Sequence, residues 1–259
     1  MQISTPMTPA RKKPETTARR KAKARAGGPK KSPVTAAEAL AWLEARGARK
    51  NIDALKRYGI TVTRAFGVTV GDTKKYGQQV GKDHALAQKL WESGWYEARL
   101  LAAFVDEPAQ VTARQMQKWA ADFDNWAIVD TVCFHLFDRA PDAWSQVPVW
   151  ANETAEFTKR AAFALLWSLS LHDKTAPESL FLKCLPLFEE GARDDRNFVK
   201  KAVNMALRAV GRRSPALNAA AIQTAQRLAA MKAATPRWVG RHALRELTSA
   251  AARKRLHSR

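Results

Sequence analysis

Cysteine is scarce in this chain, and its potential metal ligands do not cluster. Only Cys133 and Cys184 occur among the 259 residues, both in apolar surroundings and without a pairing pattern. The five histidines are scattered, and none has a second ligand at helical or Cys-x-x-Cys spacing. The sequence therefore predicts no disulfide framework, no metal and no cofactor, and it favours a reducing compartment.

Long apolar runs are also missing. No run approaches the ~20 residues that a membrane span requires, and the richest one, residues 161–171, contains two serines. The N-terminus lacks the apolar core of a signal peptide, so we expect a cytoplasmic protein without a membrane contact. Strand-like alternation occurs only over residues 60–70, where Gly67 interrupts it. This segment is predicted to be an extended connection, because a lone short strand has no partner.

Acidic residues are outnumbered, with 24 Asp and Glu against 44 Lys and Arg, which gives a formal net charge of +20. Nine of these excess charges lie in the first 32 residues, and eleven remain in residues 33–259. A soluble surface rich in Lys and Arg is the alternative explanation for this surplus, but the mutual repulsion of so many like charges disfavours it unless an anion binds. A nucleic-acid partner is therefore favoured.

Residues 1–33 are rich in Pro, Thr, Ala, Lys and Arg and nearly devoid of large apolar side chains, which predicts a disordered basic arm. Residues 34–259 are predicted to form one helical domain. Helix starts are expected at the capping box Thr35–Glu38, at Thr112, at Thr175–Glu178 and at Ser214–Pro215.

A helix opening recurs along this domain. An aromatic residue is followed three or four positions later by a charged residue and then by small apolar residues. The charged positions are Arg99, Asp130, Arg160, Lys201 and Arg241, at steps of 31, 30, 41 and 40 residues. Helical periods of this size predict an all-α, HEAT-like solenoid of stacked antiparallel helix pairs. The recurring charges are expected to face one concave groove, which would be basic apart from Asp130.

The cations of this groove suit a phosphate backbone, and Arg160 is the first choice because a guanidinium can bind phosphate with two donors. Further candidates are Lys159, Lys200, Arg208, Arg212 and Arg213. Glu97 and Glu156 begin similar helices, and we expect them to have structural roles beside neighbouring arginines.

Asp130 differs from the other recurring positions because a DNA backbone would repel its carboxylate. Neighbouring cations are expected to depress its pKa and keep it charged. A fixed anion becomes useful where positive charge develops, as at a sugar whose glycosidic bond breaks. Trp126, one turn earlier, offers a π-face for a cationic base. The alternative is an internal salt bridge from Asp130 to Arg99 or Arg160, with Trp126 packed in the core.

The domain resembles the DNA alkylation repair family of HEAT-like glycosylases, the AlkD-like type, from about Asn51 to Ser249. The residues that carry this resemblance are Tyr58-Gly59-Ile60, Ala65-Phe66-Gly67-Val68, Leu90-Trp91 through Glu97-Ala98-Arg99, Trp126 with Val129-Asp130, Lys159-Arg160-Ala161-Ala162, and Phe198 to Val203.

The resemblance implies removal of N3- and N7-alkylated purines from double-stranded DNA without a metal or cofactor, by a protein expected to be monomeric. Trp126 and Asp130 would be the catalytic pair. Met205 stands where the family usually has a second groove tryptophan, and it provides no aromatic face. The DNA-binding residues would be Arg160, Lys159, Arg99, Lys200, Lys201, Arg208, Arg241, Met205 and Tyr58. Two alternatives remain. One is a DNA- or RNA-binding module that catalyses no reaction, which Met205 favours. The other is a protein-interaction scaffold, which the net positive charge disfavours.

Overall fold

The computed structural model describes residues 33–257, and all of their regular secondary structure is helical. The basic arm predicted for residues 1–33 lies, apart from residue 33, outside this range. The elements are α1 (Ala36–Ala45), α2 (Arg49–Arg57), α3 (Val70–Val80), α4 (His84–Glu92), α5 (Tyr96–Val105), η1 (Pro108–Gln110), α6 (Ala113–Ala121), α7 (Trp126–His135), η2 (Phe137–Arg139), α8 (Ala143–Ala151), α9 (Glu156–His172), α10 (Glu178–Lys183), α11 (Leu185–Gly191), α12 (Asn197–Gly211), α13 (Pro215–Ala230), α14 (Ala234–Leu247) and α15 (Ala250–His257).

Local capping explains several of the helix starts. Thr35 and Glu38 form the predicted capping box at α1, while the side chains of Thr112 and Ser214 cap α6 and α13. The start predicted at Thr175 is displaced. Its hydroxyl donates to Asp173, and α10 begins at Glu178 without a side-chain cap. The Asp173 carboxylate also accepts from the backbone amides of Thr175 and Ala176, so Thr175 belongs to the turn before the helix.

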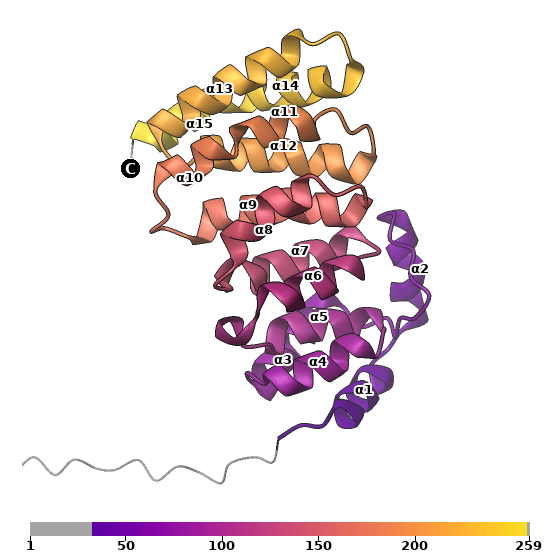
Figure 1. The fold of residues 1–259 in the computed structure, drawn as a ribbon. Coiled ribbons are helices and arrows are strands. Elements are labelled where there is room, and N and C mark those ends of the chain that lie inside the picture. The colour runs from indigo at the N-terminus through magenta and orange to yellow at the C-terminus, as the bar shows by residue number, and fades with distance from the viewer. Residues whose placement is uncertain (1–32, 258–259) are drawn as a thin grey trace, which may run out of the picture. The chain divides into compact units, whose positions relative to one another are not determined.

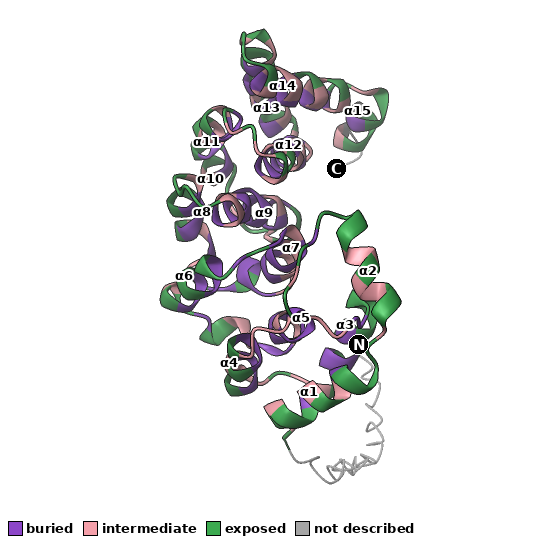
Figure 2. Ribbon diagram, turned by 90° about the vertical axis from the view of Figure 1, so that its right-hand side faces the viewer, coloured by how far each residue is buried: buried purple, intermediate pink, exposed green. Residues whose placement is uncertain are grey.

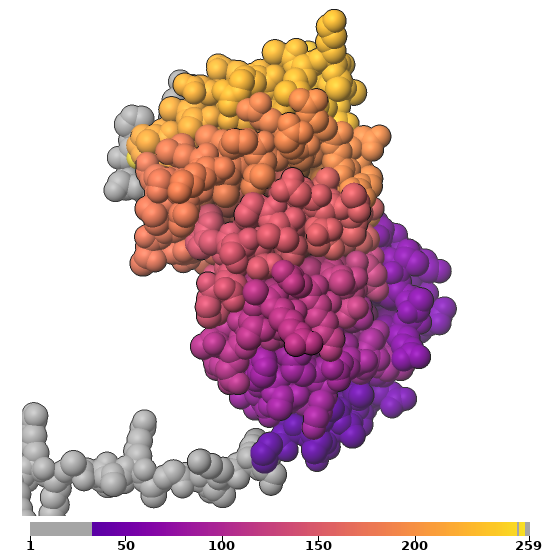
Figure 3. Space-filling view, viewed as in Figure 1, coloured from indigo at the N-terminus to yellow at the C-terminus, as the bar shows by residue number. Residues whose placement is uncertain are grey.

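The helices stack in two rows, which confirms the predicted all-α repeat fold. The inner row is formed by α5, α7, α9, α12 and α14, each packed against the next. An outer row of α4, α6, α8, α10, α11 and α13 covers one side of it (Figure 2). Seen from the outer side, the repeats follow one another in chain order (Figures 1 and 3). The five charged positions of the recurring helix opening all lie on inner helices.

Tryptophans join successive repeats of the outer row. Trp91 stacks on Trp119 with a centroid distance of 4.0 Å, and its Nε1 donates to Asp122 at 2.8 Å. Trp144 repeats this pattern by donating to Asp173 at 3.0 Å. The indoles of Trp91 and Trp144 bury a large apolar surface while their one polar atom remains hydrogen-bonded, whereas the buried Nε1 of Trp119 has no hydrogen-bond partner among the described residues.

The segment between α2 and α3 crosses to the inner row without forming a strand, as predicted. The buried carboxylate of Glu97 accepts hydrogen bonds from the backbone amides of Phe66, Gly67 and Val68 at 2.9, 2.7 and 3.2 Å. The carboxylate therefore accepts the hydrogen bonds that a neighbouring strand would accept from these amides in a sheet. Glu97 therefore has the predicted structural role. Its hydrogen-bond partners are backbone amides, whereas an arginine was expected. None of the described helices combines the length and apolarity needed to cross a bilayer.

Candidate functional site

Trp126 and Asp130 line one cavity on the inner row. The Asn125 side chain accepts from the amides of Ala127 and Ile128 at 3.1 and 3.0 Å, so α7 begins at Trp126. Asp130 follows one turn later on the same face. The cavity, which we call the α7 pocket, has a volume of about 540 Å³. Its lining residues are Arg57, Tyr58, Gly59, Trp126, Asp130, Arg160, Asn197, Phe198, Lys201 and Met205.

The Asp130 carboxylate is held by Arg160 through two hydrogen bonds. The Arg160 Nε donates to Oδ1 at 3.0 Å and Nη2 donates to Oδ2 at 2.7 Å. Nη1 donates to the Phe198 carbonyl at 2.8 Å. The side chain of Arg160 is 5% exposed and that of Asp130 is 21% exposed. The salt bridge considered as an alternative is therefore present, but its acidic partner still reaches the open pocket.

The expected depression of the Asp130 pKa is wrong. Burial raises the pKa of this carboxyl, and the charge and hydrogen bonds of Arg160 lower it by less. Counting neighbouring cations in the sequence includes the attraction but omits the loss of hydration that tertiary packing imposes. A carboxylate with a raised pKa is a stronger proton acceptor than an exposed aspartate.

Trp126 is half-buried against the core and is tied to the α2–α3 segment. Its Nε1 donates to the Tyr58 carbonyl at 2.9 Å, and the Arg160 guanidinium carbon lies 5.9 Å from its ring centroid. The Tyr58 side chain itself is 65% exposed. Gly59 has φ +69°, and a Cβ there would lie 3.1 Å from Phe198 Cζ. The backbone of Tyr58 and Gly59 thus closes one side of the α7 pocket.

Four lining residues were not among the predicted site residues: Arg57, Gly59, Asn197 and Phe198. Phe198 belongs to the recurring helix opening, so its aromatic position was a usable signal. Gly59 stands in the Tyr58-Gly59-Ile60 segment that carries the resemblance, so its position was a usable signal too. Arg57 carried none, because the contact of the neighbouring Tyr58 with Trp126 spans 68 positions of the chain.

Three of the predicted phosphate contacts are engaged with acidic residues. Arg99 donates to the Asp122 carbonyl at 3.0 Å and lies 3.9 Å from both the Asp122 and Asp124 carboxylates. Lys159 lies 3.8 Å from Asp194. Arg208 forms an ion pair with Glu246 and donates to Asn204 at 3.3 Å. These cations brace the stack, but Lys159 shares Asp194 with Arg196, and Arg208 shares Glu246 with Arg212.

The other predicted residues lie along α12 and α14. Lys201 and Met205 line the α7 pocket, whereas the Lys200 ammonium lies 5.9 Å from the ring centroid of Trp238. Arg241 lines a separate cavity of about 290 Å³ on α14, which we call the α14 pocket. The recurring charges therefore share the inner row, but the structure distributes them between compensated pairs and open pockets.

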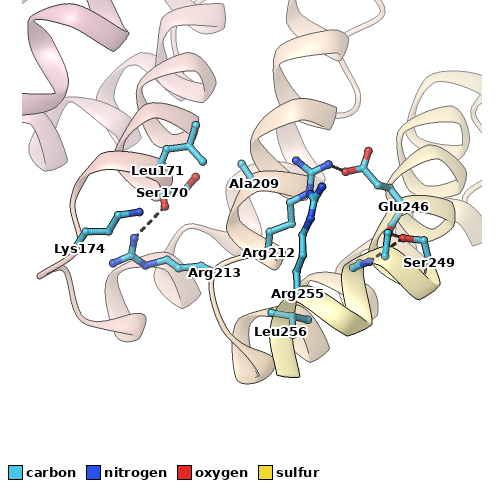
Figure 4. A pocket seen from close by; sticks show the side chains of 12 residues that line it. Ser170, Leu171, Lys174, Ala209, Arg212, Arg213, Glu246, Ser249, Arg255 and Leu256 are labelled. Atoms are coloured by element: carbon cyan, nitrogen blue, oxygen red, sulfur yellow. Dashed lines mark hydrogen bonds and ion pairs between the residues drawn. The ribbon is translucent and has the colours of Figure 1, made fainter. Parts of the chain in front are cut away.

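A third cavity, of about 320 Å³, lies between the ends of α9 and α12 and the last two helices (Figure 4). Two of its arginines are held by other protein atoms. Arg213 donates to the carbonyls of Ser170 and Ala176 at 3.0 and 3.2 Å, and Arg212 forms an ion pair with Glu246. No group of three or more potential metal ligands occurs within residues 33–257.

Comparison with known proteins bears on this site. The profile of the family described as DNA alkylation repair enzyme matches residues 39–247. A Listeria monocytogenes protein, known as uncharacterized protein Lmo0209, is 26% identical over 117 residues. That alignment covers 44% of this chain and 51% of the relative, so the chain spans about half the length of this curated relative.

One solved structure has a TM-score of 0.66 to this chain, at 20% sequence identity, and the match covers 74% of this chain and 83% of the other. That protein is described as a member of a new family related to the HEAT-like repeat DNA glycosylases, with affinity for branched DNA structures. At this level of identity, the likeness shows that the two proteins share a fold.

Proposed function

The chain belongs to the DNA alkylation repair enzyme family, and we propose that it hydrolyses the N-glycosidic bond of cationic N3- or N7-alkylated purines in double-stranded DNA. One observation carries this proposal. The carboxylate of Asp130 and the indole of Trp126 form part of the same open pocket, whose other charged lining residues, Arg57, Arg160 and Lys201, are cationic.

An alkylated purine bears a positive charge, so it is a good leaving group and needs no protonation by the protein. As the bond between C1′ and the purine nitrogen breaks, its electron pair neutralises the base and positive charge develops on the sugar. The Asp130 carboxylate stabilises that charge and orients a water whose oxygen attacks C1′. The proton released from this water passes to Asp130 or to solvent.

Trp126 and Arg160 support this chemistry in different ways. The indole presents a π-face to the cationic base, and its hydrogen bond to the Tyr58 carbonyl keeps the ring in one orientation. Arg160 holds both carboxylate oxygens, so Asp130 is oriented before the substrate binds. We assign Arg160 as a positioning residue, since its side chain is buried behind the carboxylate.

Replacement of Asp130 by Asn tests the proposal. We expect Asp130→Asn to reduce release of 7-methylguanine from methylated duplex DNA by ~100-fold or more, because the stabilising charge is lost. Duplex affinity should remain nearly unchanged, since the carboxylate does not attract phosphates. Asp195→Asn is the matched control, because it removes an equally charged but exposed carboxylate near the start of α12.

Chromatography of the freed bases gives the rates, and a thermal melt confirms that both variants are folded. Equal base release by Asp130→Asn and the wild-type protein would refute the catalytic role of Asp130. Release by the wild-type protein that is no faster than spontaneous depurination would refute the glycosylase proposal itself.

The second candidate function is recognition of damaged or branched DNA without bond cleavage. Two features favour it: Met205 gives the α7 pocket a thioether where the resemblance implies an aromatic face, and Arg160 already compensates the Asp130 charge. The same protein preparation decides between the candidates. Tighter binding to a forked duplex than to a linear one, together with no base release, would support this second function.

A further inference from the structure

A cavity lies at the far ends of the inner helices, away from the α7 pocket (Figure 4). It has a volume of about 320 Å³ and is bounded by the ends of α9, α12 and α14 and by α15, and we call it the α15 pocket. Lys201 near the start of α12 lines the α7 pocket, whereas Arg212 at the end of the same helix lines the α15 pocket. At the rise of an α-helix these two positions are ~16 Å apart. The α15 pocket is therefore a second cavity, which the proposed chemistry does not use.

Positive charge dominates the lining of the α15 pocket. Among the described lining residues Glu246 is the one acid, and the cations are Lys174, Arg212, Arg213 and Arg255. Glu246 forms ion pairs with both Arg208 and Arg212, so two guanidinium groups share one carboxylate. Because like charges that converge on a cavity repel one another, a bound anion would lower the electrostatic energy of this lining.

Arg213 is held in place by groups that carry no charge. Its Nη1 and Nη2 donate to the carbonyls of Ser170 and Ala176 at 3.0 and 3.2 Å, and its guanidinium carbon lies 4.4 Å from the ring centroid of Phe181. These contacts orient the guanidinium without neutralising it. A ligand that binds to Arg213 therefore immobilises little additional side chain.

The α15 pocket also has an apolar side. Leu171 and Leu256 line it, and Leu171 is 39% exposed, which is unusual among the large apolar residues of the described chain. Ala209 and Ala252 are small, buried lining residues that leave the space between the leucines open. An apolar group that covers Leu171 would remove apolar surface from water. A cavity of about 320 Å³ is at the lower end of the usual size of small-molecule sites.

We propose that the α15 pocket binds a small organic phosphate, in which a phosphate monoester is joined to a compact apolar or aromatic body. A monoester carries about two negative charges at neutral pH and several acceptor oxygens, so it suits converging cations better than a singly charged carboxylate or the phosphodiester of a DNA strand. The guanidinium groups can each bind phosphate oxygens with two donors. The body packs over Leu171 and Leu256. This site shares no lining residue with the α7 pocket, so the inference is independent of the proposed function.

Calorimetric titration of the full chain with phenyl phosphate tests this inference. Benzoate keeps the aromatic body but carries a single charge, and inorganic phosphate keeps the charge but has no body. We expect phenyl phosphate to bind ~10-fold more tightly than either comparison probe, because each of them lacks one of the two contacts. Benzoate that binds as tightly as phenyl phosphate would overturn the assignment to a phosphate, and inorganic phosphate that binds as tightly would overturn the role of the apolar side.

Two double variants place the binding in this pocket. Lys174→Gln with Arg255→Gln removes two exposed cations of the lining, whereas Lys183→Gln with Lys254→Gln removes two exposed cations that do not line it. Both double variants lower the net charge equally, so non-specific attraction changes by the same amount. We expect the pocket variant to weaken phenyl phosphate binding by ~10-fold or more and the control to weaken it by less than ~2-fold. Equal affinities of the two double variants would overturn the inference.

Leu171→Ala gives a readout that does not depend on charge. It should weaken binding of phenyl phosphate and leave that of inorganic phosphate unchanged, and an equal loss for both probes would contradict the apolar contact. A short undamaged duplex should not displace phenyl phosphate, and displacement would assign the α15 pocket to the DNA-binding surface instead. Thermal melts confirm that the variants are folded. None of these measurements involves base excision, so their outcome is separate from that of the Asp130→Asn assay.

Discussion

Glu97 fastens the segment that closes one side of the α7 pocket, and its replacement by Gln tests that role. Its side chain is fully buried, and its carboxylate accepts hydrogen bonds from three consecutive backbone amides at 2.7–3.2 Å. Glu97→Gln keeps the size of the side chain but places an NH₂ group where an acceptor is needed. We expect a loss of both overall stability and local order in residues 58–69.

The size of the effect follows from the contacts. A hydrogen bond to a charged group contributes ~1.5–3 kcal/mol, and a buried donor left without its partner costs ~1–3 kcal/mol. The glutamine carbonyl can still serve some of the amides, so we expect the free energy of unfolding to fall by ~3–5 kcal/mol. In a domain of this size each kcal/mol shifts Tm by ~2–4 °C, which predicts a decrease of ~6–20 °C.

Circular dichroism melts of Glu97→Gln and of the exposed control Glu153→Gln measure this difference. Hydrogen exchange should also speed up at the amides of Phe66, Gly67 and Val68 more than elsewhere, because their acceptor is lost directly. A Tm within ~2 °C of the wild-type value, with unchanged exchange at these amides, would show that Glu97 does not hold the segment.

Two further predictions concern buried charge. Arg160→Met leaves the Asp130 carboxylate buried without its partner, so urea denaturation should show a loss of ~3–5 kcal/mol that adding Asp130→Asn partly restores; no restoration would mean that the pair is not coupled. Burial, together with Lys74 and Arg139, lowers the pKa of His135 to about 4 from its usual 6.5. The unfolded chain therefore binds the extra proton between about pH 6.5 and pH 4, and stability should fall as pH decreases through this window. His135→Gln should flatten that part of the profile, and an identical profile in both proteins would contradict the assignment.

Several elements of the fold were predictable because their causes are local. The capping box at Thr35 depends on residues three positions apart, and the caps at Thr112 and Ser214 are equally short-range. The recurring helix opening was recognisable because each aromatic residue and its charged residue lie within one helical turn of each other. In the structure these charged residues lie on successive inner helices. The later start of α10, at Glu178, has a local cause too, since the Asp173 side chain holds Thr175 in the turn before the helix.

The candidate site was predicted in part. Trp126 and Asp130 were identified as a pair, and the structure places both in one pocket. The direction of the Asp130 pKa was wrong, because burial is a property of the packed fold. The role expected of Arg160 as a phosphate contact also changes. Its donors hold Asp130 and the Phe198 carbonyl.

The sequence alone was sufficient to predict the helices, their repeat and the common face of the recurring charged residues, since each of these follows from residue patterns within a few helical turns. Packing decided which charges remain available. Asp130 and Arg160 are 30 positions apart and Trp126 and Tyr58 are 68 apart, yet each pair meets at about 3 Å. Electrostatic energies change steeply with such distances and with loss of water, so only the folded chain determines which cations are paired and which can bind a phosphate.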